Sequence, residues 1–334
     1  MRFPVLTLLS LGAMKKSLFK DESFMSFHPK YGYWGTPNFQ RTVYFSEYSK
    51  EINVSHDQFG NRAIKNSSYG NISQPTIMFL GGSHTWGAGL ENNETYPAII
   101  QKNTSYNCLN FGQCSVGLDQ MVIVLVDQIK KIKPKHVIIE LHPWVVHRVL
   151  RRSAIGYPKP YFKIEDNKIS LVNISKLNYL KMFRKLLSKY AEFQKELDEY
   201  FAEIDISKIR IDKNHDPLFI VWNQDYYRSM YKIIQFLLQT AKNLCEENQA
   251  NLVILLGPTQ QELEFRPKVI NLIDPRIPRV RLREILISEK ISYLDLGPKF
   301  ESAVNLENKG IYADGHINES GHRLFANLIS EKIT

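Results

Sequence analysis

The amino-acid sequence predicts an α/β protein: a three-layer α/β/α sandwich with about five parallel strands. A small β-rich extension stands at the N-terminus, and a helical insertion follows the third strand. The first supporting observation is a set of short apolar runs without alternation, which is typical of strands buried on both faces. The second is that segments with helical spacing separate these runs, as in a doubly wound sheet.

Residues 1–23 precede the β-rich region and carry an apolar stretch at residues 3–14. This stretch is shorter than the roughly 20 residues that a membrane-spanning helix needs. It fits the core of a signal peptide or the remnant of an anchor. The alternatives are a flexible start, a buried amphipathic start or a true initiator at Met14, and a cytoplasmic protein. The stretch favours an exported or membrane-anchored protein without a stable membrane span.

Residues 24–72 form the predicted β-rich extension, with short strands at residues 42–45 and 51–54 followed by a turn that carries Arg62. Two interpretations are open. The extension is either a flap that places Arg62 over an active site, or an appendage that covers the edge of the sheet. The second is favoured, because arginines at such turns usually pair locally.

Residues 73–334 form the predicted main domain. Its expected strands are residues 77–80, 106–111, 136–141, 251–256 and 291–296. Its expected helices are residues 95–102, 117–131, 225–248, 279–290 and 321–333. Because strands and helices alternate along the chain, all five strands are expected to run parallel.

Residues 142–249 interrupt this alternation and are predicted to be a lid made of a hairpin and helices. The hairpin turns at residues 166–167, and a long amphipathic helix is expected at residues 176–206. A membrane-surface helix is the alternative for the latter segment. The lid is favoured, because acidic residues share the polar face with the lysines and arginines.

The formal charge of +9 leaves anionic partners open, but no zinc-finger, helix-turn-helix or RNA-binding signature is present. A nucleic-acid partner is therefore not expected. The three cysteines, Cys108, Cys114 and Cys245, do not make a disulfide framework. A bridge between Cys108 and Cys114 is conceivable, although buried thiols are the better interpretation. The sequence leaves the oligomeric state open.

The candidate site begins at Ser83, which directly follows Gly81 and Gly82 at the end of the first predicted strand. Open α/β sheets bind their ligands at the carboxyl ends of their strands. A serine nucleophile needs a histidine base, and that base needs a carboxylate to orient it. His316 and Asp314, two residues apart near the end of the chain, provide both groups. A turn serine and a helix-capping histidine are the alternatives.

Three sequence blocks resemble those of the SGNH, or GDSL-like, hydrolase superfamily. They are GGSHTWG from Gly81, LNFGQCSVGLDQ from Leu109 and DGHINESGH from Asp314. The resemblance implies an SGNH/flavodoxin-like sheet and a triad of Ser83, Asp314 and His316. It also implies an oxyanion hole formed by the amides of Ser83 and Ser115, with Gly112 as a further candidate. Ser115 stands where the family usually has a glycine.

The third block departs from the family pattern, because no asparagine follows the strand at residues 136–141. Trp144 stands about where the asparagine would be, and its indole N–H or a ring nitrogen of His142 could donate instead. His84, His142 and Arg62 are expected to line the substrate site at most.

The expected function is hydrolysis of a small acyl ester or an O-acylated carbohydrate through an acyl-enzyme on Ser83. Transfer of the acyl group to a glycan hydroxyl is one alternative. A non-catalytic glycan-binding or assembly protein is another, and the missing asparagine favours it. No cofactor is expected, because Gly82 to Gly89 lack the spacing of a dinucleotide or phosphate loop. No metal is expected either, because the sequence shows no cluster with metal-ligand spacing.

Overall fold

Five parallel strands form the central sheet of the computed structural model, which describes residues 24–45, 50–70, 73–155, 157–165, 168–173, 227–264, 274–307, 310–313 and 315–333. These strands are β5 (Thr76–Gly81), β6 (Asn107–Gly112), β7 (His136–Leu141), β12 (Asn251–Leu256) and β13 (Tyr293–Asp295). They lie in the order β13-β12-β7-β5-β6 and every pair is parallel. This is the 2-1-3-4-5 order of flavodoxin-like sheets, and it confirms the predicted SGNH/flavodoxin-like fold class.

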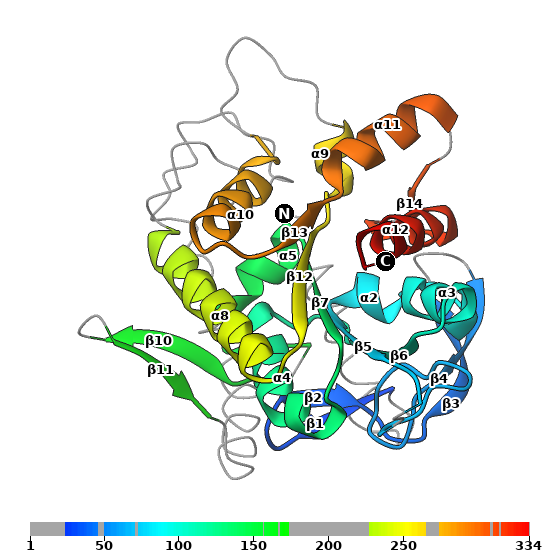
Figure 1. Cartoon of the computed structure of the whole chain (residues 1–334), viewed down its shortest axis with the longest axis horizontal. Helices are drawn as coiled ribbons and strands as arrows, with labels where there is room; N and C mark the ends of the chain where they lie inside the picture. Colours follow the sequence, from blue (N-terminus) through cyan, green and yellow to red (C-terminus); the bar gives the residue numbers. More distant parts are fainter. Residues whose placement is uncertain are drawn as a thin grey trace, which may run out of the picture.

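Both faces of the sheet are apolar, because successive side chains of each strand point to opposite faces. In β5, Met78 and Leu80 join one buried cluster, and Ile77 and Phe79 join another. The first cluster includes side chains of α4 (Leu118–Ile132), α8 (Arg228–Glu247) and α10 (Ile277–Ser288). The second includes side chains of α3 (Tyr96–Asn103), α11 (Gly297–Glu307) and α12 (Glu319–Ile333). Figure 1 shows these two helical layers on either side of the sheet.

Helix α8 lies within the segment that was predicted as a lid, yet it packs against α4 and β12. Its apolar side, which includes Ile234, Leu237 and Leu238, is buried in the larger core cluster. The helix therefore belongs to a layer of the sandwich, where it connects β7 to β12 after the insertion. The predicted helix at residues 176–206 lies outside the described residues.

The predicted hairpin of the insertion is present as β10 (Tyr161–Glu165) and β11 (Lys168–Val172). The elements that precede it along the chain are α5 (Pro143–His147), η3 (Arg148–Leu150), β8 (Ser153–Ala154) and β9 (Tyr157–Pro158). The shorter elements elsewhere are α2 (Ser83–Trp86), η2 (Asn92–Glu94), α9 (Gln260–Glu264), β14 (Tyr312–Ala313) and β15 (His316–Ile317).

The N-terminal extension consists of two hairpins, and the residues after them reach the edge of the central sheet. The hairpins are β1 (Met25–His28) with β2 (Gly32–Gly35) and β3 (Gln40–Phe45) with β4 (Lys50–Ser55). The backbone of Arg62 pairs with Asn110 of the edge strand β6. This pairing favours the edge-covering interpretation of the extension.

All three cysteines are free thiols, and Cys108 and Cys245 are buried. The conceivable Cys108–Cys114 bridge is therefore absent, and the interpretation of Cys108 and Cys245 as buried thiols is confirmed. Within the described ranges, no helix combines the length and the hydrophobicity that crossing a membrane requires. The apolar stretch at residues 3–14 lies outside the described residues, so its predicted role as a signal or anchor stays a prediction.

Candidate active site

Ser83 lies where β5 passes directly into α2, at the carboxyl end of the sheet. Two glycines make this tight turn possible, because a Cβ on Gly81 would lie 1.8 Å from the Thr85 hydroxyl oxygen and one on Gly82 would lie 3.1 Å from Val145. Ser83 is the first residue of α2, and it is 7% exposed. Amides of the first helical turn have no partner within the helix, so the site starts with an available backbone donor.

His316 lies opposite Ser83, on the short hairpin formed by β14 and β15. Its Nε2 atom is 2.9 Å from the Oγ atom of Ser83, which is hydrogen-bonding distance. The hairpin is attached to neighbouring loops at several points. The amide of Gly315 donates to Oε1 of Gln260 at 3.1 Å, and the hydroxyl of Tyr312 donates to the carbonyl of Pro258. These contacts hold the imidazole beside the serine.

The strand order explains why these two groups meet here. In a 2-1-3-4-5 sheet the second strand is added on one side of the first and the third strand on the other side. The strand order therefore reverses between the first and third strands, and ligands bind at this switch point. In this protein the switch point lies between β5 and β7. Ser83 and His84 follow β5, and His142 follows β7. The predicted triad carboxylate, Asp314, lies outside the described residues, so its role stays a prediction.

Gly112, a further oxyanion candidate, is already engaged elsewhere. Its amide donates to Oδ1 of Asn110 at 2.9 Å, and the amide of the same Asn110 side chain donates to the carbonyl of Thr85 at 2.8 Å. A Cβ on Gly112 would lie 2.3 Å from the backbone nitrogen of Trp86. The structure therefore gives Gly112 a packing role, in which its missing side chain lets α2 approach β6.

Ser115, the other predicted oxyanion donor, has a left-handed backbone with φ of 62°. Non-glycine residues adopt this region less easily than glycine does, so this position favours the glycine that the sequence resemblance places here. The donor role of the Ser115 amide stays a prediction.

Arg62 and Trp144 do not gain a direct role from the geometry. Arg62 is buried, its guanidinium lies 4.3 Å from the ring centroid of Trp86, and it donates to the carbonyl of Leu90 at 2.6 Å. It therefore supports α2 from the side of the extension. Trp144 lies half-buried in α5. The predicted lining and oxyanion roles of these two residues remain untested predictions.

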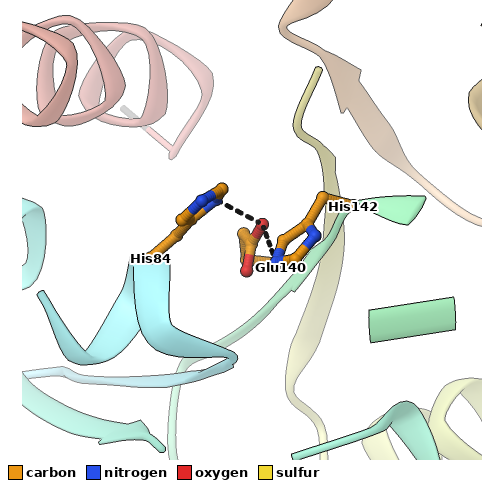
Figure 2. Close-up of side chains that lie close together, drawn as sticks. All are labelled: His84, Glu140 and His142. Atoms are coloured by element: carbon orange, nitrogen blue, oxygen red, sulfur yellow. Dashed lines mark ion pairs between the residues drawn. The ribbon is translucent and has the colours of Figure 1, made fainter. Parts of the chain in front are cut away.

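Next to the serine–histidine pair lies a buried cluster of His84, Glu140 and His142 (Figure 2). Nδ1 of His84 is 3.6 Å from Oε1 of Glu140, and Nε2 of His142 is 3.9 Å from the same oxygen. Burial lowers the pKa of His142 well below its ordinary value, and the neighbouring His84 adds to this effect. The imidazole of His142 is therefore neutral at pH 7, where it can act as a ligand.

Glu140 was missed in the sequence because it sits inside an apolar run, HVIIEL, that predicts a buried strand. A carboxylate in such a strand, two residues before a histidine at the strand's carboxyl end, is the signal that could have found it. The expectation that no metal is bound rested on linear spacing, and it stays a prediction. The three side chains come from the ends of two different strands, and linear spacing does not reveal such a group.

The cavity of about 530 Å³ that is lined by His136, Cys245 and Asn251 lies elsewhere. His136 and Asn251 are the first residues of β7 and β12. The cavity is therefore at the amino ends of the strands, whereas Ser83 and His316 meet at the carboxyl ends. It plays no part in the candidate active site.

No protein-family model matches the chain. No curated protein matches it either. Solved structures that resemble it include a lipolytic protein of the G-D-S-L family from Veillonella parvula, with 14% identity over 77% of this chain and 97% of that one and a TM-score of 0.42. An acetyl xylan esterase has 10% identity over 78% of this chain and 100% of that one, with a TM-score of 0.44.

A further similar structure is esterase EstA from a Pseudoalteromonas species, with 11% identity over 78% of this chain and 97% of that one and a TM-score of 0.39. These similar structures are of lipolytic proteins and esterases, and the similarity extends over 77–78% of this chain. The fold assignment itself comes from the strand order and the register of this protein's own sheet.

Proposed function

We propose that this protein is a serine-dependent ester hydrolase with Ser83 as its nucleophile. The observation that carries the proposal is the 2.9 Å contact between Nε2 of His316 and Oγ of Ser83 at the switch point of the sheet. A serine hydroxyl is a weak nucleophile at neutral pH, and an imidazole at this distance accepts its proton as the new bond forms.

In the first half-reaction, Oγ of Ser83 attacks the carbonyl carbon of the ester, and its proton passes to Nε2 of His316. The carbon–oxygen bond to the alcohol then breaks, and the alcohol leaves with that proton. In the second half-reaction His316 accepts a proton from water as the water attacks the acyl-enzyme. The bond between the acyl carbon and Oγ then breaks, His316 returns the proton to Oγ of Ser83, and the acid is released. Asp314 is proposed to orient His316.

The negative oxygen of the tetrahedral intermediate is proposed to accept hydrogen bonds from the amides of Ser83 and Ser115. The chain lacks the asparagine that the resemblance places after β7. Loss of one oxyanion donor typically lowers the rate by about 10²- to 10³-fold. We therefore expect a slow esterase compared with enzymes that have a third donor.

The substrate is proposed to carry a small acyl group, because Ser83 is buried and only 7% exposed. A carbohydrate as the alcohol half follows from the sequence resemblance alone. Comparing p-nitrophenyl acetate with acetylated oligosaccharides, and with longer p-nitrophenyl esters, tests both parts of this proposal.

The deciding experiment is labelling with a fluorophosphonate probe, followed by mass spectrometry of the digested protein. We expect one adduct on Ser83, no adduct in Ser83→Ala, and unchanged labelling in Ser105→Ala, which removes an exposed serine before β6. Turnover of p-nitrophenyl acetate should disappear in Ser83→Ala alone. Equal turnover in the wild type and Ser83→Ala, with no adduct, would rule out the esterase and favour a binding protein.

A further inference from the structure

His84, Glu140 and His142 converge at the same end of the sheet as Ser83. Their exposed fractions are 3%, 0% and 2%, and one candidate ligand atom of each lies within 4.8 Å of the others. Figure 2 shows the two rings on either side of the carboxylate. None of the three side chains is needed by the proposed reaction of Ser83 and His316, so the cluster calls for its own explanation.

The distances within the cluster are too long for hydrogen bonds. Nδ1 of His84 and Nε2 of His142 are 3.6 and 3.9 Å from Oε1 of Glu140, whereas a nitrogen–oxygen hydrogen bond spans about 2.7–3.2 Å. Two ligands of one tetrahedral zinc ion, each about 2.0–2.2 Å from the metal, lie roughly 3.3–3.6 Å apart. The observed distances are therefore closer to those between ligands of one ion.

The contact that His84 makes through its other ring nitrogen supports the same conclusion. Nε2 of His84 lies 3.3 Å from the carbonyl oxygen of Gly315, which can only accept. A hydrogen bond to this carbonyl requires the hydrogen on Nε2, and a ring with its single hydrogen there directs the lone pair of Nδ1 toward the Glu140 carboxylate. Among the described residues, Nδ1 of His84, Oε1 of Glu140 and both ring nitrogens of His142 have no hydrogen-bond partner. A positive charge between the facing acceptors would satisfy them.

We propose that the protein binds one divalent metal ion of the zinc class through Nδ1 of His84, Oε1 of Glu140 and Nε2 of His142. Two imidazoles and one carboxylate are a common zinc ligand set, and it leaves a fourth position open. The contact from His84 to the carbonyl of Gly315 then has a recognised function. Metal-bound histidines usually donate their second ring N–H to a carboxylate or carbonyl, which holds the ring in place.

The metal ion would also connect β5 and β7 to the loop that carries His316. Gly315 precedes His316, and its carbonyl contacts a ligand of the proposed ion. His84 and Glu140 are positioning residues in this sense, because they act on the imidazole through the loop. This positioning role rests on the proposed function of His316, whereas metal binding itself does not.

The test uses the full chain, purified with a tag that contains no histidine. Metal content is measured by plasma mass spectrometry after purification, and again after stripping with a chelator and reloading with zinc chloride. We expect about one zinc ion per chain and a melting temperature that rises on reloading. Cobalt(II) chloride should give the visible absorption bands of a tetrahedral site.

Glu140→Gln and His142→Asn should weaken zinc binding by at least 100-fold. His136→Asn serves as the matched control, because His136 is also a buried histidine of β7 but lies at the opposite end of the strand and contacts Tyr106. Its zinc content should remain near one per chain. If the cluster variants do not fold, cobalt titration of the stripped wild type decides the question.

Less than a tenth of an equivalent of metal after reloading, with no cobalt bands and no change in melting temperature, would overturn the proposal. The cluster would then have only a structural role in the buried end of the sheet. These measurements use no substrate. A failed metal site with an intact fluorophosphonate adduct, or the reverse, therefore separates this proposal from the esterase proposal.

Discussion

Nε2 of His316 lies 2.9 Å from Oγ of Ser83, although 233 positions of the chain separate the two residues. One group stands on the turn after β5, and the other on the β14–β15 hairpin. The hairpin is held by bonds to α9, through Gln260, and to α2, through His84. The pairing therefore depends on the packing of several loops at one end of the sheet.

Replacing His316 with alanine should abolish activation of Ser83. Without the imidazole the hydroxyl keeps its proton, and loss of such a base costs roughly 10⁴- to 10⁶-fold in turnover. The rate of labelling with a fluorophosphonate, followed by quenching at successive times, and the rate of p-nitrophenyl acetate hydrolysis measure the loss. His28→Gln, which changes a histidine on the β1 strand, should keep wild-type rates. Labelling of His316→Ala at the wild-type rate would contradict the assignment.

Replacing Gly112 with alanine should displace α2 and with it Ser83. The new Cβ would lie 2.3 Å from the backbone nitrogen of Trp86, so the backbone has to move. Overpacking of this kind typically costs about 1–3 kcal/mol, and a shift of about 1 Å at a reacting group can cost about 10²-fold in rate. Urea unfolding and labelling rates measure both effects.

Gly310→Ala is the control for this substitution, because the one atom of the described residues that its Cβ would meet is the carbonyl oxygen of Tyr312, at an ordinary 3.5 Å. We expect it to leave stability and labelling nearly unchanged. Equal behaviour of the two alanine variants would show that α2 does not depend on close approach to β6.

The stability of the protein should fall as the pH drops from 6.5 to 4, partly through His56. Its ring accepts from Nε1 of Trp86 at 3.2 Å and lies 3.2 Å from the carbonyl of Thr36. Burial lowers its pKa from 6.5 to about 4. Between these two values the unfolded chain binds a proton that the folded ring does not bind, so unfolding becomes more favourable at lower pH.

One such group changes the free energy of unfolding by up to about 1.4 kcal/mol per pH unit. His56→Gln should therefore show a shallower decline than the wild type between pH 6 and 5, measured by urea unfolding. It should also be less stable at pH 7, because the contacts to Trp86 and Thr36 change. Parallel stability curves for the two proteins would show that His56 titrates normally in the folded state.

Lys159 and Asp119 form a fully buried ion pair between the insertion and the first turn of α4. Lys159→Met leaves the Asp119 carboxylate buried without its partner, which typically costs about 3–5 kcal/mol. The double variant Lys159→Met with Asp119→Leu should recover much of this loss. Urea unfolding of the two single variants and the double variant measures the coupling. Additive losses would show that the two charges do not stabilise each other.

The sequence by itself determined the class of fold and the outline of the site. Apolar runs such as residues 77–80 are typical of strands that are buried on both faces of a covered parallel sheet. The five strands could therefore be predicted from these runs, and most of the helices from the spacing of apolar residues between them. The placement of Ser83 at a strand end followed in the same way. The resemblance of three short blocks then connected that serine to His316.

Only the tertiary structure decided which of these residues touch. It placed α8 in a layer of the sandwich, engaged the amide of Gly112 with Asn110, and packed Arg62 on Trp86. It also brought the carboxylate of Glu140 within 3.9 Å of a ring nitrogen of both His84 and His142. These contacts join the ends of strands that are distant in the chain, and their geometry is set by strand order and close packing. Local residue patterns carry no information on those distances, which is why the buried cluster was found only in the folded protein.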